Sequence, residues 1–469
     1  MNQAYLAADF GGGSGRVIAG WLDAGRLQLK EVHRFRNRQV RLGARLYWDF
    51  PALFEDLKEG LKRAAAEGFN VKSVGVDTWG VDFGLIDREG ELIGLPVCYR
   101  DGRTQGMQGV VFQRIDRAAH YACTGIQQMD INTLFQLYSM KCADDFRLEK
   151  AHRLLFMPDL FAFFLTGVAS NEYTIASTSE LLDAARRNWS WPTLKSLGLP
   201  QHLFSELVEP GQVRGRLTPE LAAETRLGPI DVVAVGSHDT ASAVVATPLE
   251  PGAAFLSSGT WSLLGVELAE PILTEAARLA EFTNEGGVGG TIRFLQNITG
   301  LWLLQRLMGE WEAAGDAQTF DTLLPAAEAS TYDALLPVAD ARFVNPASME
   351  QEIAACLREQ GVALPQTKAD TARCVMRSLA NKYAVAIATL STLLPQPVTQ
   401  LNIIGGGSQN ALLNRFTAEA AGLPVLAGPV EATAMGNILV QAIAAGELAD
   451  ISATRDVVRR SIELKRYEF

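Results

Sequence analysis

The sequence has few of the residues that build disulfide frameworks or metal sites. There are five cysteines, an odd number, and no two of them form a C-x-x-C pair. The five histidines likewise include no pair at metal-ligand spacing. These absences speak against a disulfide-stapled fold and against a structural zinc site.

Long apolar runs and targeting signals are also missing. The most apolar stretch, residues 154–169, is interrupted by Pro158-Asp159 and is too short to cross a bilayer, so we interpret it as buried core. No basic segment precedes the first apolar residues, as it would in a secretory signal. We therefore expect a cytoplasmic protein that does not associate with membranes.

Positive charge is the third shortage. The formal net charge is −11 at pH 7, and we recognise no cluster of lysine and arginine in the chain. Proteins that bind nucleic acids need such clusters to neutralise the phosphate backbone. We expect no nucleic-acid partner, and any anionic ligand has to be held by a local site.

The first glycine-rich loop lacks the two commonest phosphate-binding motifs, G-x-x-x-x-G-K-[ST] and G-x-G-x-x-G. Residues 11–16 read Gly-Gly-Gly-Ser-Gly-Arg and join two predicted strands, 5–9 and 17–22. Glycine N–H groups, the Ser14 hydroxyl and the Arg16 guanidinium are groups that can clasp a phosphate. A flexible hairpin tip explains the same residues, so both interpretations stay open.

The length of 469 residues allows two or three domains, and 48% hydrophobic with 20% charged residues is ordinary for a globular enzyme. The first predicted elements follow the order β-β-β-α-β, over 5–9, 17–22, 27–35, 51–68 and 71–76. Asp77-Thr78-Trp79-Gly80 follows the last strand, a typical position for an active-site rim. Trp79 can stack on a sugar there, and plain core packing is the alternative.

Asp239 lies where an apolar run, residues 232–235, gives way to a Gly-Ser turn and a small-residue helix. The first turn of a helix has unpaired N–H groups and the positive end of the helix dipole, which favour an ionised carboxylate. Such a carboxylate can accept a proton from a substrate. A simple helix cap is the alternative, because aspartate is common at that position.

Two turns in the second half of the chain also suggest phosphate or nucleotide binding. Strands 253–256 and 261–268 flank a hydroxyl-rich turn and repeat the plan of the opening hairpin, although hardly its letters. Strand 401–404 ends in Gly405-Gly406-Gly407. This is either a turn that a nucleotide approaches closely or a tight turn without a ligand.

Other segments carry weaker signals. A second glycine-rich loop, residues 285–290, precedes a predicted helix over 297–311, in which Asn297 and Gln305 are the polar exceptions. Residues 101–228 are predicted to be mostly helix and loop, and we assign no catalytic role there. That region is interpreted as an insertion or lid that shapes a substrate cleft.

Six motifs, in order along the chain, carry a resemblance to a known family. They are Asp9-Phe10-Gly11 with Ser14-Gly15-Arg16, G-V-D-T-W-G-V-D-F from Gly75, S-H-D-T-A-S-A from Ser237, L-S-S-G-T-W from Leu256, T-N-E-G-G from Thr283, and Gly405-Gly406-Gly407. The chain resembles the FGGY carbohydrate kinases, within the actin-like ATPase superfamily, nearly from end to end. The D-T-W-G-V-D-F and S-H-D-T-A-S-A strings resemble the members that act on L-rhamnulose and separate them from glycerol and xylulose kinases.

This resemblance implies an α/β fold of two actin-like, ribonuclease H-like ATPase domains with a cleft between them. The N-terminal domain, 1–245, would bind the sugar and carry the first phosphate loop, and the C-terminal domain, 246–469, would bind the nucleotide. The implied reaction transfers the γ-phosphoryl group of ATP to O1 of L-rhamnulose, with Mg²⁺ as cofactor. The implied assembly is a monomer or a weak homo-oligomer.

The resemblance also implies the roles of particular residues. Asp239 is the general base, and it lines the sugar pocket together with Gly80, His238, Thr240 and Asn297. The residues that contact ATP are Gly12, Gly13, Ser14, Gly15, Arg16, Thr260, Gln305 and Gly406. Asp9 orients Mg²⁺ through water.

The first loop departs from the family pattern, because Gly12-Gly13 stands where Ala-Ser or Thr-Thr is more usual and at least one hydroxyl is lost. Two alternatives to the implied function stay open. Another ketose such as L-fuculose is one, since a pocket discriminates a methyl group by only about 1–3 kcal/mol. A non-kinase actin-like ATPase or a sugar sensor is the other, and sugar-dependent formation of ADP separates both from a kinase.

Overall fold

The computed structural model describes residues 3–344 and 346–469, and the chain folds as two compact units. Unit 1 comprises Met1–Pro248, Glu267–Leu295 and Ala432–Ile462, and unit 2 comprises Leu249–Val266, Gln296–Glu431 and Glu463–Phe469. The units therefore interleave along the chain, whereas the predicted domains follow one another. The linear boundary between residues 245 and 246 stays a prediction, as does the expected cleft.

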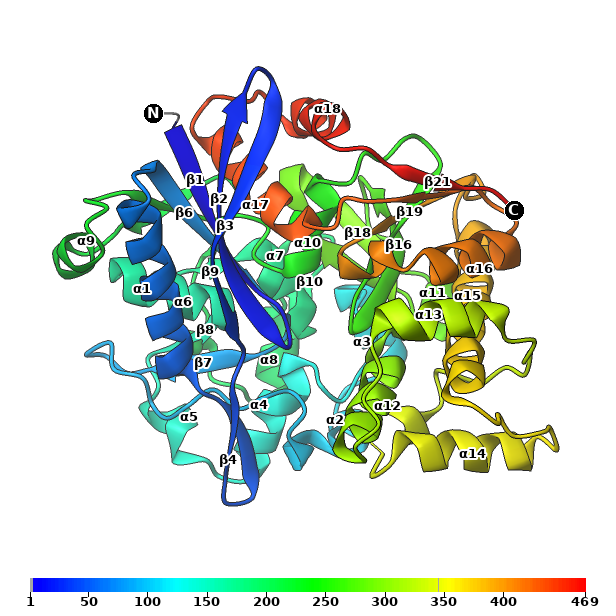
Figure 1. Cartoon of the computed structure of the whole chain (residues 1–469). Coiled ribbons are helices and arrows are strands. Elements are labelled where there is room, and N and C mark those ends of the chain that lie inside the picture. The colour runs from blue at the N-terminus through cyan, green and yellow to red at the C-terminus, as the bar shows by residue number, and fades with distance from the viewer. Residues whose placement is uncertain (1–2, 345) are drawn as a thin grey trace. The chain divides into compact units, whose positions relative to one another are not determined.

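A six-stranded sheet forms the centre of unit 1, with the strand order β13-β14-β6-β1-β2-β3 (Figure 1). β1 (Gln3–Phe10), β2 (Ser14–Asp23) and β3 (Arg26–Arg36) form the predicted antiparallel meander. β6 (Asn70–Thr78) and β14 (Asp231–Val233) then add to β1 in parallel. Asp9 of β1 and Asp77 of β6 are register partners, so the carboxyl ends of these two strands place two aspartates side by side.

Helix α1 (Phe50–Ala66) begins close to the predicted position because Asp49 caps it and a proline lies in its first turn. Its apolar face joins the core of unit 1. A Cβ at Gly60 would lie 2.3 Å from Val17 Cγ2, so the helix approaches β2 closely. The hairpin that precedes α1, β4 (Gln39–Leu42) and β5 (Arg45–Trp48), is not anticipated by the sequence pattern.

Residues 101–228 are mainly short helices and loops, as predicted. The helices are α2 (Met107–Val111), α3 (Arg117–Thr124), α4 (Thr133–Cys142), α5 (Phe146–Lys150), α6 (Met157–Thr166), α7 (Tyr173–Ala176), α8 (Trp191–Leu197) and α9 (Pro219–Thr225). The short strands here and just before are β7 (Phe83–Ile86), β8 (Arg153–Phe156), β9 (Asn171–Glu172), β10 (Leu182–Asp183), β11 (Asn188–Trp189) and β12 (Leu207–Val208). β13 (Val213–Arg216), which the prediction missed, pairs antiparallel with β14 and extends the main sheet. Within residues 3–344 and 346–469, no helix is long and apolar enough to span a bilayer.

The remaining elements of unit 1 come from three distant parts of the sequence. They are α10 (Asp239–Val245), α11 (Glu275–Leu279), β17 (Thr283–Gly286), the first half of β18 (Ile292–Thr299), α17 (Ala432–Ala444) and α18 (Ile451–Ser461). α17 covers the central strands, since Gln441 Nε2 donates to the carbonyl of Leu6 at 2.9 Å. A Cβ at Gly436 would lie 1.8 Å from the carbonyl oxygen of Ser242, so α17 and α10 meet backbone against backbone.

Unit 2 repeats the strand order of the unit 1 sheet. Its strands follow the order β18-β16-β15-β19-β20-β21, with β15 (Ala253–Ser258), β16 (Trp261–Leu268), β19 (Gln400–Ile404), β20 (Val425–Ala427) and β21 (Lys465–Tyr467). β15 pairs antiparallel with β16 and parallel with β19, as β1 does with β2 and β6. The helices are α12 (Trp302–Ala313), α13 (Phe320–Ala329), α14 (Met349–Glu359), α15 (Lys368–Leu393) and α16 (Ala411–Ala421). The topology confirms the weak repeat of the opening hairpin.

Two predicted elements are wrong in part. The helix predicted over 297–311 begins only at Trp302, because residues 297–299 continue β18, and Asn297 therefore lies on a strand. The loop predicted over 285–290 is shorter, since its first two residues belong to β17. Gly289 and Gly290 make the turn with φ of 73° and 82°, a conformation that residues with a side chain rarely adopt.

One basic cluster contradicts the expectation that the chain contains none. Five arginines lie within residues 34–45 and all are exposed: Arg34, Arg36, Arg38, Arg41 and Arg45. Two of them form ion pairs, Arg34 with Glu31 and Arg45 with Asp101. The expected absence of a nucleic-acid partner therefore rests on the net charge alone and stays a prediction.

The close contact between α10 and α17 predicts that Gly436→Ala lowers the free energy of unfolding by about 1–3 kcal/mol, because the added methyl group meets backbone atoms that cannot rotate away. Gly309→Ala in α12 is the matched control, since a Cβ there would have no neighbour within 4 Å. The control should stabilise by up to about 1 kcal/mol. Denaturant unfolding measures both changes, and equal effects would contradict the packing of α10 against α17.

Candidate active site

Asp239 is the first residue of α10, as predicted, and its side chain is 31% exposed. Its Oδ1 accepts hydrogen bonds from Thr240 N at 2.5 Å and from Thr240 Oγ1 at 3.0 Å. The N-cap position belongs to His238, whose backbone is bridged to Thr78 at the end of β6. Asp239 is therefore the first residue of the helix and not its N-cap, and its carboxylate lies beside the ends of the parallel strands.

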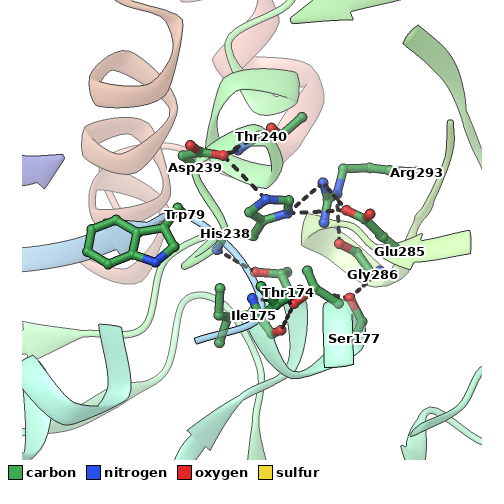
Figure 2. A network of polar contacts seen from close by, with 12 residues as sticks. Trp79, Thr174, Ile175, Ser177, His238, Asp239, Thr240, Glu285, Gly286 and Arg293 are labelled. Carbon is green, nitrogen blue, oxygen red and sulfur yellow. Dashed lines mark hydrogen bonds and ion pairs between the residues drawn. The ribbon is translucent and has the colours of Figure 1, made fainter. Parts of the chain in front are cut away.

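A polar network surrounds His238 (Figure 2). Its Nε2 lies 3.4 Å from Asp239 Oδ1, and its Nδ1 lies 3.2 Å both from Arg293 Nη1 and from Glu285 Oε2. Arg293 and Glu285 form an ion pair of 3.1 Å, and the side chain of Arg293 is 0% exposed. Arg293 Nε donates to the carbonyl of Gly286 at 2.9 Å. Sequence reasoning assigned no role to Glu285 or Arg293.

Helix α7 contacts this network through Thr174. Thr174 Oγ1 accepts from His238 N at 3.3 Å and donates to Glu172 Oε2 at 2.7 Å. The Glu172 carboxyl also accepts from two backbone N–H groups of α7. Burial nonetheless raises the pKa of Glu172 to about 8. Through Thr174, this buried carboxyl helps to fix the backbone of His238.

Asp82 fixes the two tryptophans at the predicted rim. Its Oδ2 accepts from Trp48 Nε1 at 2.6 Å, from Trp79 Nε1 at 3.0 Å and from Tyr99 N at 3.0 Å. Its Oδ1 accepts from Gln136 Nε2 at 2.9 Å. Burial raises the pKa of Asp82 to about 6, and these hydrogen bonds oppose the rise. The indole of Trp79 is 5% exposed, so most of it belongs to the core.

Gly80 follows Trp79 and leads into an unusual backbone conformation. A Cβ at Gly80 would lie 3.3 Å from Thr178 Oγ1. The next residue, Val81, has a φ of 67°, which is rare for a β-branched side chain. Thr178 Oγ1 accepts a hydrogen bond from Val81 N at 3.1 Å, and Thr133 Oγ1 donates one to the carbonyl of Val81 at 2.7 Å. The backbone at Gly80 is thus held in place by two threonines.

The first glycine-rich loop is the turn between β1 and β2. Gly11 N donates to Ser14 O at 3.0 Å, and Asn37 donates both to Gly13 O and to Gly11 O. A Cβ at Gly12 would meet only Tyr99 Oη at 3.9 Å, and one at Gly13 would meet nothing within 4 Å. These two positions therefore have room for the side chains that are more usual in the family.

Asp9 and Arg16 form a cross-strand pair at the base of this loop. They are register partners, and Arg16 Nη2 donates to Asp9 Oδ2 at 2.6 Å. Asp77 lies beside Asp9 and accepts from Asn437 Nδ2 at 2.6 Å. Burial and the charges of Asp9 and Asp239 raise the pKa of Asp77 well above its usual range. Three carboxyl groups therefore lie close enough to influence one another at one edge of the sheet.

The nucleotide residues predicted in unit 2 lie close together there. Thr260 Oγ1 donates to Gln305 Oε1 at 3.2 Å. A Cβ at Gly407 would lie 2.0 Å from Ser258 Oγ, so the triple glycine packs on the hairpin that carries Thr260 and places Gly406 beside it. Asn297, on β18, also belongs to unit 2.

The structure thus brings the predicted residues together in two groups. Unit 1 contains Asp9, Gly12, Gly13, Ser14, Gly15, Arg16, Gly80, His238, Asp239 and Thr240, and unit 2 contains Thr260, Asn297, Gln305 and Gly406. Sequence reasoning missed Glu285, Arg293 and the role of Asp82. The opposite charges of Glu285 and Arg293 across a glycine turn are a hairpin signal that could have revealed the first two.

Two family models match the chain. The N-terminal domain of the FGGY family of carbohydrate kinases matches residues 4–246, and the C-terminal domain of that family matches residues 254–445. The chain belongs to the FGGY family of carbohydrate kinases and is therefore a phosphotransferase.

Curated relatives are similar over nearly their whole length. The chain is 44% identical over 468 residues to the rhamnulokinase of Bacteroides thetaiotaomicron, and the alignment covers 100% of this chain and 96% of that protein. It is 43% identical over 466 residues to the rhamnulokinase of Pectobacterium atrosepticum, with coverages of 98% and 92%. For the rhamnulokinase of Oceanobacillus iheyensis the identity is 39% over 467 residues, with coverages of 100% and 98%.

Solved structures share the fold at low sequence identity. A ligand-bound xylulose kinase from Lactobacillus acidophilus superposes with a TM-score of 0.81 at 14% identity, covering 99% of this chain and 94% of that one. Plasmodium falciparum glycerol kinase with ADP gives 0.79 at 13% identity, with coverages of 99% and 94%. These likenesses confirm the predicted α/β fold in two domains.

Four N–H groups donate to the two carboxylate oxygens of Asp82. In Asp82→Asn one of these oxygens becomes an N–H₂ group, which cannot accept a hydrogen bond, so a buried donor is left unpaired. We therefore expect the free energy of unfolding to fall by about 1–3 kcal/mol. Burial raises the folded-state pKa to about 6, so the carboxyl of the parent protein stabilises the fold at low pH and loses that contribution as the pH rises through about 6. The deficit of the variant should therefore be about 1 kcal/mol larger at pH 5 than at pH 7.5. Urea unfolding at both values measures this difference, and a deficit that does not depend on pH would contradict the assigned titration.

Proposed function

We propose that this chain transfers the γ-phosphoryl group of ATP to O1 of L-rhamnulose, giving L-rhamnulose 1-phosphate and ADP. The single observation that carries the chemistry is Asp239, whose carboxylate begins α10 beside the ends of the parallel strands. The sugar is inferred from curated rhamnulokinases that are 38–44% identical over nearly the whole chain. A role in L-rhamnose catabolism and a cytoplasmic location belong to the same proposal.

Asp239 is the general base in this proposal. An acceptor hydroxyl must lose its proton as it attacks the γ-phosphorus, and a carboxylate within hydrogen-bond reach can take it. His238 and Thr240 flank Asp239, and Gly80 presents backbone atoms whose positions the neighbouring threonines fix. These residues, together with Asn297, form the proposed sugar contacts.

The nucleotide contacts are proposed on two hairpins of the same plan. Gly12, Gly13, Ser14, Gly15 and Arg16 offer backbone N–H groups, a hydroxyl and a guanidinium in unit 1. Thr260, Gln305 and Gly406 are the corresponding group in unit 2. Arg16 is paired with Asp9, so a phosphate at this loop competes with that carboxylate for the guanidinium.

Mg²⁺ is proposed to accompany ATP, and the residues present fit it. Asp77 Oδ1 is buried and has no hydrogen-bond partner within residues 3–344 and 346–469, and Asp9 lies beside Asp77. In the same residues, no group of three or more histidine, cysteine or acidic side chains could hold a metal ion. Mg²⁺ typically uses one or two carboxylates plus substrate phosphates, which suits such a pair. Bound there, the ion would neutralise charge on the phosphate oxygens, and Asp9 would hold it through water.

L-Fuculose or another ketose is the nearest rival substrate, because a pocket discriminates a methyl group by only about 1–3 kcal/mol. A non-kinase ATPase or a sugar sensor is a more distant rival, and membership of a carbohydrate kinase family disfavours it. The monomeric or weakly associated state remains part of the proposal.

A panel of ketoses tests the function by coupled measurement of ADP. L-Rhamnulose should give the highest kcat/KM and stoichiometric ADP, and ATP alone should give little turnover. A higher kcat/KM with another ketose would replace the proposed substrate, and ADP formation independent of any sugar would remove the kinase reaction.

The same assay tests the base. Asp239→Asn should lower kcat by ~10²–10⁴ with a modest change in sugar affinity, since a general base is lost while the pocket keeps its shape. Near-normal turnover of this variant would exclude Asp239 from that role.

The open space at Gly13 predicts that Gly13→Ser lowers the KM for ATP by about two- to fivefold, because a hydroxyl that the family usually provides is restored. Gly15→Ala is the matched control, since its Cβ would lie 2.2 Å from Phe35 Cε2 and should disturb the hairpin instead. Steady-state kinetics with varied ATP measure both. An unchanged KM in Gly13→Ser would show that no phosphate approaches this position.

A further inference from the structure

A buried ion pair next to the proposed base has no assigned role. Glu285 and Arg293 are directly opposite each other on β17 and β18, and their charged atoms are 3.1 Å apart. Their side chains are 5% and 0% exposed. Burying two charges costs free energy that their attraction does not always return, so a hydrophobic pair would serve stability equally well. The place of this pair, against His238, suggests a different use.

Arg293 determines which nitrogen of His238 carries the proton. A guanidinium has only donors, and Arg293 Nη1 makes a hydrogen bond of 3.2 Å with His238 Nδ1. Nδ1 must therefore accept. In a neutral imidazole the proton then resides on Nε2.

Glu285 keeps the guanidinium in that position. Its Oε2 lies 3.2 Å from Nδ1 and 3.1 Å from Arg293 Nη1, so the arginine lies within reach of the carboxylate and the imidazole together. The carbonyl of Gly286 holds Arg293 Nε at 2.9 Å from the other side. If the arginine were absent, the Glu285 carboxylate, 3.2 Å from Nδ1, would draw the proton there.

The Nε2 edge of the imidazole lies beside Asp239, the proposed base. Figure 2 shows His238 between the ion pair and Asp239, with Nε2 at 3.4 Å from Asp239 Oδ1. A proton on Nε2 would lie on the side of the ring nearest that oxygen, which accepts from Thr240 N and Thr240 Oγ1. Within residues 3–344 and 346–469, the hydrogen bonds that this carboxylate accepts, from Thr240 N and Thr240 Oγ1, fall on Oδ1. His238 Nε2 lies 3.4 Å from the same oxygen.

We propose that Glu285 and Arg293 are positioning residues that hold His238 as its Nε2–H tautomer, so that Asp239 Oδ1 is occupied by donors and Oδ2 is the oxygen that receives the substrate proton. The inference rests on the proposed function for the role of Asp239, but the tautomer itself is a property of the protein without substrate. Proton transfer to one defined oxygen fixes the direction from which the hydroxyl must approach.

The tautomer is measured directly by NMR of the full chain labelled with ¹⁵N-histidine, at a pH where the ¹⁵N shifts show that the imidazole is neutral. The chain has only five histidines, and His238→Gln identifies the signals of His238 by their loss. The expected result is a protonated Nε2 and a bare Nδ1. A protonated Nδ1, or two rapidly exchanging tautomers, overturns the proposal, and this measurement needs no variant of the ion pair.

Substitution of Arg293 tests the consequence. Arg293→Met should move the proton to Nδ1, lower kcat by about 10–100-fold and change the KM for the sugar by less than about threefold. Arg293→Lys retains a donor-only group, so it should keep the Nε2–H tautomer and lose less than about tenfold in kcat. Equal losses in both variants with an unchanged tautomer would overturn the proposal.

Arg455→Met is the matched control for loss of the arginine from a partly buried ion pair. Arg455 pairs with Glu267 at 2.6 Å in the same unit, with side chains 17% and 16% exposed. This variant should melt at a lower temperature, as Arg293→Met does, while its His238 tautomer and kcat stay unchanged. If Arg293→Met were too unstable to study, the proposal would still be tested by the His238 tautomer in the unsubstituted protein and in Arg293→Lys. A proton on Nε2 in both supports the proposal, and a proton on Nδ1 in either overturns it. If no ketose supports ADP formation, the proposed function fails while the NMR result stands.

Discussion

The parallel pairing of β1, β6 and β14 is the constraint on which the site in unit 1 depends. Register places Asp9 beside Asp77, and the bridge from Thr78 to His238 carries the next segment to the same edge. Because carboxyl ends of parallel strands meet at one edge, residues that are far apart in sequence become neighbours without any long loop. Asp239 is then placed simply by being the next residue and the start of a helix.

This arrangement collects negative charge, and the surrounding residues limit its effect. Asp9 forms an ion pair with Arg16, and Asp77 accepts a hydrogen bond from Asn437. Asp239 accepts hydrogen bonds from the backbone N–H and the hydroxyl of Thr240. Burial, together with the charges of Asp9 and Asp239, nevertheless raises the pKa of Asp77 well above its usual range. A site of this kind suits a reaction in which a cation and a polyphosphate arrive together, because each then compensates the other.

Much of the scaffold could be predicted from the sequence, because alternating apolar residues, glycine turns and a helix start are local signals. These signals located the β1–β2 and β15–β16 hairpins and put Asp239 at a helix N-terminus. They fail where pairing depends on register, as with Glu285, which is predicted to lie in a glycine-rich loop but belongs to a strand and pairs with Arg293. They also failed for Asp82, whose donors come from Trp48, Trp79, Tyr99 and Gln136 and meet only in the folded chain.

The interleaving of the two units has a consequence for how the chain is made. Helix α17 belongs to unit 1, yet it is translated after nearly all of unit 2, and its Gly436 meets the backbone of α10. While the ribosome is still adding residues up to about 430, the helix that carries Asp239 has no α17 surface to rest on. The helix that begins with Asp239 therefore lacks this packing contact until synthesis of the chain is almost complete.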